Sequence, residues 1–112
     1  MRRISITTFR SGFVMSSIDE WRIKIDDVDR KLVALLNMRA TYADEIGKIK
    51  ERLGLDAYSP QREHEVVENV LGANKGPLSD AALRRLFERI IDESRRLERE
   101  AMIERKRPSS QK

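Results

Sequence analysis

A long apolar stripe constrains this chain more than any other feature of its sequence. From residue 18 to residue 49, apolar side chains recur at alternating spacings of three and four, the period of one face of an α-helix. No proline occurs in this segment, so the sequence predicts a single helix of about 35 residues. The stripe consists of Ile18, Trp21, Ile25, Val28, Leu32, Leu35, Tyr42, Ile46 and Ile49, with Arg39 at the position between Leu35 and Tyr42.

The length of this helix predicts a dimer. At 1.5 Å per residue the helix would be about 50 Å long, whereas a compact domain of this size has a radius of gyration of only about 13 Å. The rest of the chain has room for one short and one long helix, which cannot cover the whole stripe. Because a second copy of the chain would cover it, we expect an intertwined homodimer.

Capping signals define where the helices begin. The segment from Ser17 to Glu20 has the pattern of a capping box and is expected to start the first helix. Ser59-Pro60 provides an N-cap and a first-turn proline for a helix that ends near Gly72. Ser79 caps a third helix that runs to about Glu104. The predicted fold class is therefore all-α, with long, short and long helices.

One domain is expected, at residues 16–104, because a chain of 112 residues has room for a single modest core. Residues 1–15 show no helical period and are interpreted as a disordered leader, with Met15 as an alternative start of the protein. Residues 105–112 are interpreted as a disordered basic tail.

The distribution of charge argues against a nucleic-acid-binding protein. The formal net charge is +4, from 23 basic and 19 acidic residues. Seven of the basic residues lie in the two terminal segments, which contain no acid, so the predicted domain keeps 16 basic residues and a net charge of −3. Binding along a phosphate backbone requires clustered lysine and arginine on one folded face. A domain with this mixture of charges is not expected to provide that face.

The composition also bears on compartment and on membrane partners. No apolar run approaches the roughly 18 residues that cross a membrane, and no continuous apolar stretch follows Arg2 and Arg3 as a secretory signal would require. There are no cysteines, which excludes disulfides and thiolate metal sites. We therefore expect a cytoplasmic protein with neither a membrane nor a nucleic acid as its partner.

Cationic residues on the first helix are candidates for binding an anion. Arg39 lies on the apolar stripe, where a guanidinium group is unfavourable unless an anion meets it. Lys50 lies about 20° further round the helix and about 16 Å along it. The alternative explanation for Arg39 is a structural ion pair, and the alternative for Lys50 is an ordinary surface lysine. Arg22 lies about 25 Å from Arg39, so only Arg22 of the partner subunit, on an antiparallel helix, could reach the same small ligand. Taken alone, Arg22 is better explained as a surface residue.

The other two helices add polar residues beside their apolar faces. Arg62 and Glu63 lie one turn before an apolar pair, although exposed charges near a helix start are an equally good explanation. Ser94 lies within the apolar stripe of the third helix, and Glu98 follows one turn later. Burial of Glu98 would raise its pKa and allow it to donate a proton. His64, the only histidine, is flanked by glutamates and is assigned no role.

The set of candidates contains no nucleophile. The sequence has no Ser-His-Asp or Cys-His combination, no cluster of metal ligands and no glycine-rich phosphate loop. The candidate residues can bind carboxylates and stabilise developing charge. This chemistry suits a small anionic substrate whose bond changes occur within the molecule, without a metal or cofactor.

Five ordered segments carry a resemblance to a known family. They are residues 21–29 (WRIKIDDVD), 35–39 (LLNMR), 46–50 (IGKIK), 60–63 (PQRE) and 90–98 (IIDESRRLE). Together with the spacing of Arg22, Arg39 and Lys50 on one helix, they make the chain from about residue 18 to residue 102 similar to the all-helical chorismate mutases, the AroQ class. The resemblance implies an intertwined helical dimer that converts chorismate to prephenate, a Claisen rearrangement, without a cofactor.

The resemblance also implies a role for each candidate. Arg39 and Arg22 of the partner subunit would bind the two substrate carboxylates, and Lys50 would donate to the ether oxygen. Glu63 would accept from the ring hydroxyl. The implied catalytic residues are Lys50, Glu98 and Arg39, and the other implied substrate-binding residues are Arg22, Ser59, Arg62, Glu63 and Ser94, with Ile46 and Ile91 as apolar walls.

Two positions depart from the family pattern. Ser59 stands where the family often has an acid, and it is expected to keep the helix cap. The position of Glu98 is glutamine in some members and glutamate in others. Glutamine can donate a hydrogen bond at any pH, whereas glutamate must be protonated to do so. The sequence therefore predicts turnover that weakens as the pH rises through the pKa of Glu98.

Two other functions are compatible with the same residues. An isochorismate-pyruvate lyase shares the fold and the cationic pocket and eliminates pyruvate from an isomeric substrate. A helical dimerisation or regulatory module would use Arg39 only in an ion pair, but it would not need Lys50, Arg62-Glu63 and Ser94 together. Association with another enzyme of the shikimate pathway is a further possible partnership.

Overall fold

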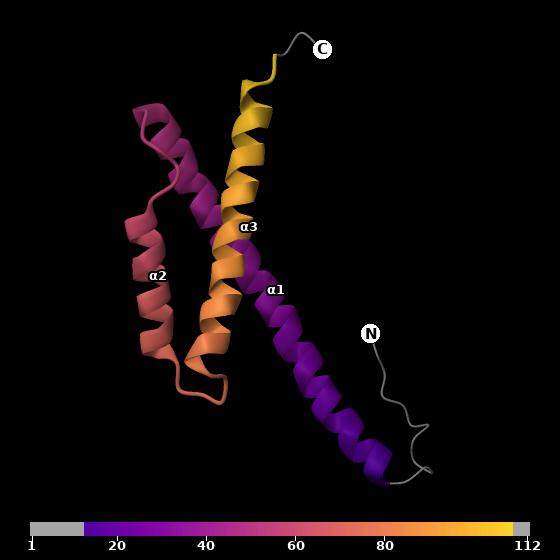
Figure 1. The fold of residues 1–112 in the computed structure, drawn as a ribbon. Coiled ribbons are helices and arrows are strands. Elements are labelled where there is room, and N and C mark those ends of the chain that lie inside the picture. The colour runs from indigo at the N-terminus through magenta and orange to yellow at the C-terminus, as the bar shows by residue number, and fades with distance from the viewer. Residues whose placement is uncertain (1–12, 109–112) are drawn as a thin grey trace. The chain divides into compact units, whose positions relative to one another are not determined.

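The protein is built from three α-helices. The computed structural model describes the backbone of residues 13–108 and the side chains of residues 17–108. The helices are α1 (Phe13–Leu53), α2 (Pro60–Ala73) and α3 (Asp80–Lys106), and the described residues contain no strand (Figure 1). The predicted all-α class, with long, short and long helices, is confirmed.

The first and third helices extend beyond their expected ends. Because α1 begins at Phe13, Ser17 is not its N-cap, and the last three residues of the expected leader are helical. No glycine or proline occurs between Phe13 and Ser17 to stop the helix there. At the other end α3 includes Arg105 and Lys106, so the first two residues of the expected tail are helical as well. Residues 1–12 and 109–112 lie outside the described residues.

Side-chain caps and local backbone geometry define the other boundaries. The Ser59 hydroxyl accepts a hydrogen bond from the Arg62 amide at 3.2 Å, and the Ser79 hydroxyl accepts one from the Ala82 amide at 3.0 Å, as the sequence predicts. Helix α1 stops before Gly54, whose φ of 71° is accessible to glycine at little cost. Helix α3 stops before Pro108, which disfavours helical geometry in the preceding residue.

The chain divides into two compact units, residues 1–38 and 39–112, with the boundary inside α1. The described part of the first unit is helical, and the apolar stripe predicted there is exposed. Trp21 is 63% exposed and Leu35 is 59% exposed. The Lys24 ammonium lies 5.7 Å from the centroid of the Trp21 ring, a cation–π contact at the helix surface.

In the second unit α2 and α3 lie side by side (Figure 1), and the C-terminal part of α1 is joined to α3 by polar contacts. One of them is the Arg105 guanidinium, which binds the Glu51 carboxylate at 2.7 Å. Arg105 therefore contributes to the fold instead of belonging to a basic tail. Val67 on α2 is the only apolar side chain among the described residues that is buried. The second unit thus has a very small core of its own.

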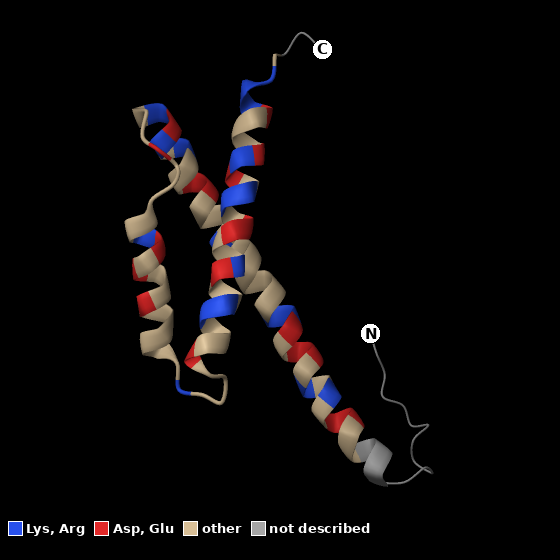
Figure 2. Cartoon of the chain, in the orientation of Figure 1, with Lys and Arg blue, Asp and Glu red and all other residues tan. Residues whose placement is uncertain are grey.

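Charged side chains are mixed along all three helices. Figure 2 shows lysine and arginine interleaved with aspartate and glutamate on α1 and α3, whereas α2 has one arginine, near its start, among its acidic residues. Many of them form pairs along one helix, such as Lys31 with Asp27 at 3.0 Å and Arg89 with Glu93 at 2.8 Å. Among residues 13–108, no helix combines the length and the apolar character that a membrane-spanning segment needs.

Candidate active site

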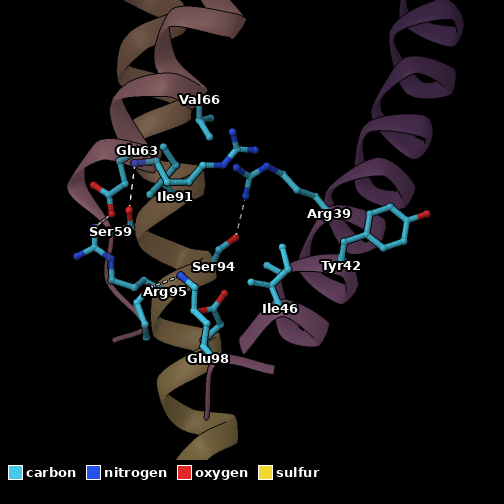
Figure 3. A pocket seen from close by; sticks show the side chains of 14 residues that line it. Arg39, Tyr42, Ile46, Ser59, Glu63, Val66, Ile91, Ser94, Arg95 and Glu98 are labelled. Atoms are coloured by element: carbon cyan, nitrogen blue, oxygen red, sulfur yellow. Dashed lines mark hydrogen bonds and ion pairs between the residues drawn. The ribbon is translucent and has the colours of Figure 1, made fainter. Parts of the chain in front are cut away.

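A pocket of about 330 Å³ opens in the second unit, between the C-terminal part of α1, the start of α2 and the middle of α3. This volume is within the range of small-molecule sites. Figure 3 shows side chains from the three helices converging on it. Seven of the eight predicted site residues line the pocket: Arg39, Lys50, Ser59, Arg62, Glu63, Ser94 and Glu98. The predicted apolar walls, Ile46 and Ile91, line it as well.

Arg22, the eighth predicted residue, belongs to the first unit and is exposed there. It is not among the residues that line the pocket. The sequence assigned Arg22 to the site of a second subunit, so its role stays a prediction.

Helix α1 contributes two cations to the pocket. Because Arg39, Ile46 and Lys50 are spaced by seven and four residues, they share one helix face. The Arg39 guanidinium donates to the Ser94 hydroxyl at 3.1 Å across the pocket (Figure 3). Among residues 17–108 Arg39 has no ion pair, so the structural ion pair considered as an alternative for it is not observed there. The Lys50 ammonium donates to the Ala57 carbonyl oxygen at 3.2 Å, which ties the α1–α2 loop to the pocket.

The first turn of α2 contributes three polar residues because its cap and proline start the helix at the pocket. Ser59 caps the helix while lining the pocket. Arg62 is 64% exposed in its side chain and pairs with Glu65 at 3.3 Å, one turn along the same helix. Glu63 is less exposed and forms an ion pair with Arg95 of α3. The alternative that these two residues are ordinary exposed charges near a helix start therefore fits Arg62 in part, but it does not fit Glu63.

Glu98 lies in the most unusual electrostatic environment of the site. Burial raises the pKa of its carboxyl group, and the negative charge of Asp44 raises it further, whereas Lys50, Arg95 and Arg39 act in the opposite direction. Its side chain packs against α1 at Gly47, which has no side chain. A Cβ atom added to Gly47 would lie 3.7 Å from the Glu98 carboxyl carbon. The pKa direction agrees with the effect expected for a buried glutamate.

Asp44 was not identified from the sequence as a residue near the site. Its Oδ1 atom is buried and has no hydrogen bond within the described residues, although the Arg105 guanidinium lies 3.7 Å away. Its Oδ2 atom lies 3.6 Å from the Lys48 ammonium. Asp44 is five residues after Arg39 on α1, and its influence on Glu98 depends on how α3 packs there.

Arg95 is the main pocket residue that the sequence reasoning missed. It stands between two predicted residues, Ser94 and Glu98, and one turn after Ile91, so the helical period alone could have placed it on the same face. Its neighbour Arg96 is 61% exposed in its side chain, whereas the side chain of Arg95 is 32% exposed. The two adjacent arginines therefore differ in exposure because of how α3 packs, and the sequence alone does not show this difference.

The pocket is cationic overall. Four cations, Arg39, Lys50, Arg62 and Arg95, line it together with two carboxyl groups, those of Glu63 and Glu98. Within the described part of the chain, no three histidine or acidic side chains are placed to hold a metal ion. With both carboxyl groups ionised, the lining has a net charge of +2, and protonation of Glu98 makes it more positive. Such a pocket can bind a small dianion and stabilise negative charge that develops within it.

The family model described as chorismate mutase type II matches residues 21–99, which include every predicted site residue. The chain belongs to the chorismate mutase type II family. The family expected from the sequence is thereby confirmed.

Individual relatives agree with the family match. A chorismate mutase structure (Form II) from Thermus thermophilus superimposes with a TM-score of 0.73 at 36% sequence identity, covering 74% of this chain and 94% of that one. Two proteins named bifunctional chorismate mutase/prephenate dehydratase are similar in sequence. The one from Neisseria gonorrhoeae is 40% identical over 83 residues, 73% of this chain. The one from Aquifex aeolicus is 34% identical over 93 residues, 80% of this chain.

The match covers only part of these bifunctional relatives. This chain spans 22% of the length of the Neisseria gonorrhoeae protein and 26% of the length of the Aquifex aeolicus protein. The similarity to the chorismate mutase type II family therefore concerns one segment of each relative.

Proposed function

We propose that this protein is a chorismate mutase, an isomerase that rearranges chorismate to prephenate without a cofactor. One observation carries the proposal. The polar residues that the family resemblance selected from three separate helices converge on one pocket, and Arg39 points into it without an acidic partner among residues 17–108 (Figure 3). A helical dimerisation module would have no need for this convergence.

The charge of the pocket suits this substrate. Chorismate has two carboxylates, and the lining of the pocket has an excess of cations. Arg39 would bind one carboxylate, because its guanidinium presents donors in a planar fork that matches a carboxylate. Its contact with the neutral Ser94 hydroxyl can be kept or exchanged when an anion arrives. Arg22 of the partner subunit would bind the other carboxylate.

The reaction requires that charge be stabilised in the transition state. As the C–O bond of the enolpyruvyl ether breaks, negative charge develops on the ether oxygen. Lys50 on α1 and Glu98 on α3 both line the pocket, and Lys50 and protonated Glu98 would donate hydrogen bonds to that oxygen. One such donor contributes roughly 3–4 kcal/mol in other enzymes. Holding the flexible enolpyruvyl arm over the ring supplies a further orientational gain.

We also propose that the functional protein is a homodimer. The apolar stripe of the first unit is exposed, with Leu32 at 49%, Val28 at 53% and Leu35 at 59%. A contiguous apolar surface of this kind is typical of an interface. Val67 is the only core residue among those described, so a single chain buries too little apolar surface for ordinary stability. A second copy would cover the stripe and supply its Arg22.

Mixing two inactive variants tests the dimer and the shared site together. Arg22→Ala and Arg39→Ala each remove one carboxylate-binding residue, so each homodimer has two defective sites. In a mixed dimer, one site combines an intact Arg39 with an intact Arg22 of the partner subunit. Unfolding and refolding an equal mixture should therefore restore about a quarter of the wild-type activity. No recovery, with mixed dimers demonstrated by mass spectrometry, would contradict the shared site.

The activity is tested by incubating the protein in parallel with chorismate and isochorismate and identifying the products by NMR. Prephenate from chorismate is the expected result. Pyruvate and salicylate from isochorismate as the main products would assign the protein to the lyases instead. Consumption of neither substrate would refute the catalytic proposal and leave the family assignment to rest on the fold and sequence.

We further propose that the protein associates with an enzyme that consumes prephenate. The relatives named bifunctional chorismate mutase/prephenate dehydratase support this, because that name assigns both activities to a single protein. Sedimentation of this protein with a prephenate dehydratase from the same cell should yield a joint species. Independent sedimentation at micromolar concentrations of both proteins would argue against the association.

A further inference from the structure

Arg95 lies in the pocket wall and is held from several directions. It extends from the middle of α3, and its guanidinium forms an ion pair with Oε2 of Glu63 on α2 (Figure 3). The same guanidinium lies 4.4 Å from the centroid of the Tyr58 ring, at the end of the α1–α2 loop. The Asp92 carboxylate, one turn earlier on α3, lies 3.8 Å away. Arg95 thus connects the loop, α2 and α3 at the edge of the pocket.

These contacts restrict the orientation of Glu63. A carboxylate bound to a guanidinium through one oxygen has its side-chain rotamer held by that bond. Stacking on Tyr58 in turn restricts the guanidinium plane, which a flexible ammonium could not reproduce. The other carboxylate oxygen, Oε1, receives no hydrogen bond from the described residues. Glu63 therefore has one oxygen bound to Arg95 and one able to accept a hydrogen bond.

Arg62 provides an internal comparison. Like Arg95 it lines the pocket, but it pairs with Glu65 along the surface of α2, and its side chain is twice as exposed. An exposed pair of this kind within one helix contributes little to stability. The Arg95–Glu63 pair joins two helices at a partly buried position, where its geometry is maintained by packing on both sides.

We propose that Arg95 is a positioning residue for substrate recognition, which holds Glu63 so that its second carboxylate oxygen accepts the hydrogen bond of the substrate ring hydroxyl. The inference rests on the proposed mutase function and adds a residue to it. Arg95 acts through Glu63, so its effect should depend on both Glu63 and the hydroxyl. A purely structural ion pair would also depend on Glu63, but it would not depend on the hydroxyl.

The test compares Arg95→Met, Arg95→Lys, Glu63→Gln and the double variant Arg95→Met/Glu63→Gln. Each is assayed with chorismate and with an analogue that lacks the ring hydroxyl. Arg96→Met is the matched control, since Arg96 is the next residue on α3 and is largely exposed. Thermal unfolding followed by circular dichroism reports stability separately.

We expect Arg95→Met to lower kcat/KM for chorismate about tenfold, the size associated with a hydrogen bond to a charged group. The loss should shrink to less than about twofold for the analogue, which lacks the hydroxyl, and in the Glu63→Gln background, which lacks the carboxylate that pairs with Arg95. Arg95→Lys should recover part of the activity, and it keeps the charge should Arg95→Met fail to fold. Arg96→Met should behave like the wild type.

Other outcomes would overturn the inference. Equal losses with chorismate and the analogue would mean that Arg95 is structural. Additive losses in the double variant would mean that Arg95 acts independently of Glu63. A wild-type protein that makes no prephenate would refute the proposed function and this inference with it. Normal wild-type turnover with unaffected Arg95 variants would refute only this inference.

Discussion

The electrostatic environment of Glu98 leads to a specific prediction about pH. The pKa of this carboxyl group is raised from its usual 4.5, first by burial and then by the charge of Asp44, against the lowering effects of Lys50, Arg95 and Arg39. An acid with a raised pKa keeps its proton to higher pH. Glu98 should therefore be able to donate to the ether oxygen at acidic pH and lose this ability as the pH rises through the raised pKa.

The size of the effect follows from the role of one donor. Above the pKa the protonated fraction falls about tenfold per pH unit, so log kcat/KM should decline with a slope near −1. The decline should level off after a total loss of about 100-fold to 1,000-fold, the usual effect of removing one donor to a developing oxyanion. Lys50 and Arg39 would then carry the residual catalysis.

The assay is the pH profile of kcat/KM, measured by the disappearance of chorismate absorbance for the wild type and for Glu98→Gln. A glutamine donates at every pH, so the variant should lose the alkaline decline and exceed the wild type there. Asp44→Asn supplies a second perturbation. Removing its negative charge should lower the pKa of Glu98 and move the decline toward lower pH.

A flat profile for the wild type would refute this reasoning, as would a decline that persists in Glu98→Gln. A decline that Asp44→Asn leaves in place would show that Asp44 does not contribute to the raised pKa of Glu98. Circular dichroism at each pH must accompany the assay, since unfolding would imitate a loss of activity.

Three further predictions concern individual side chains. Arg39→Ala should lower kcat/KM by about 100-fold to 1,000-fold with unchanged helix content by circular dichroism, because a donor to the anionic substrate is lost; wild-type activity would mean that the assigned pocket is wrong. Ser59→Ala and Ser79→Ala should each cost about 1 kcal/mol in denaturant unfolding, since each hydroxyl caps a helix, and only the first should change KM. Arg105→Gln should leave the midpoint of denaturant unfolding nearly unchanged, because its pair with Glu51 is partly exposed; a clear decrease of the midpoint would show that this contact anchors α3.

Local patterns in the sequence were sufficient for the helices. The 3-4 spacing of apolar residues and the absence of proline indicate α1, and the Ser59-Pro60 and Ser79 signals indicate where α2 and α3 begin. The capping box at Ser17 was misleading, because a cap signal also permits the helix to continue when nothing before it breaks the helix. Helix ends are decided by small energies, which neighbouring residues readily override.

The sequence predicted which residues form the candidate site, but it did not predict which of them pair with each other. The order and spacing of Arg39, Lys50, Glu63 and Ser94 along the chain indicated the family, and the structure brings these residues to one pocket. Arg95 lies within the matching segment 90–98, but the resemblance assigned it no role. Its place in the pocket comes from the contacts of α3 with Glu63 and Tyr58.

The sequence by itself determined the helical periods, the caps and the order of the polar residues, because each depends on residues within a few positions along the chain. Only the tertiary structure decided which charged groups meet: the acid Glu63 with Arg95, the acid Glu51 with Arg105, and the two acids Asp44 and Glu98 near each other. These partners lie on different helices, and the Coulomb and desolvation energies that shift a pKa depend on distance and burial in space, which separation along the chain does not encode.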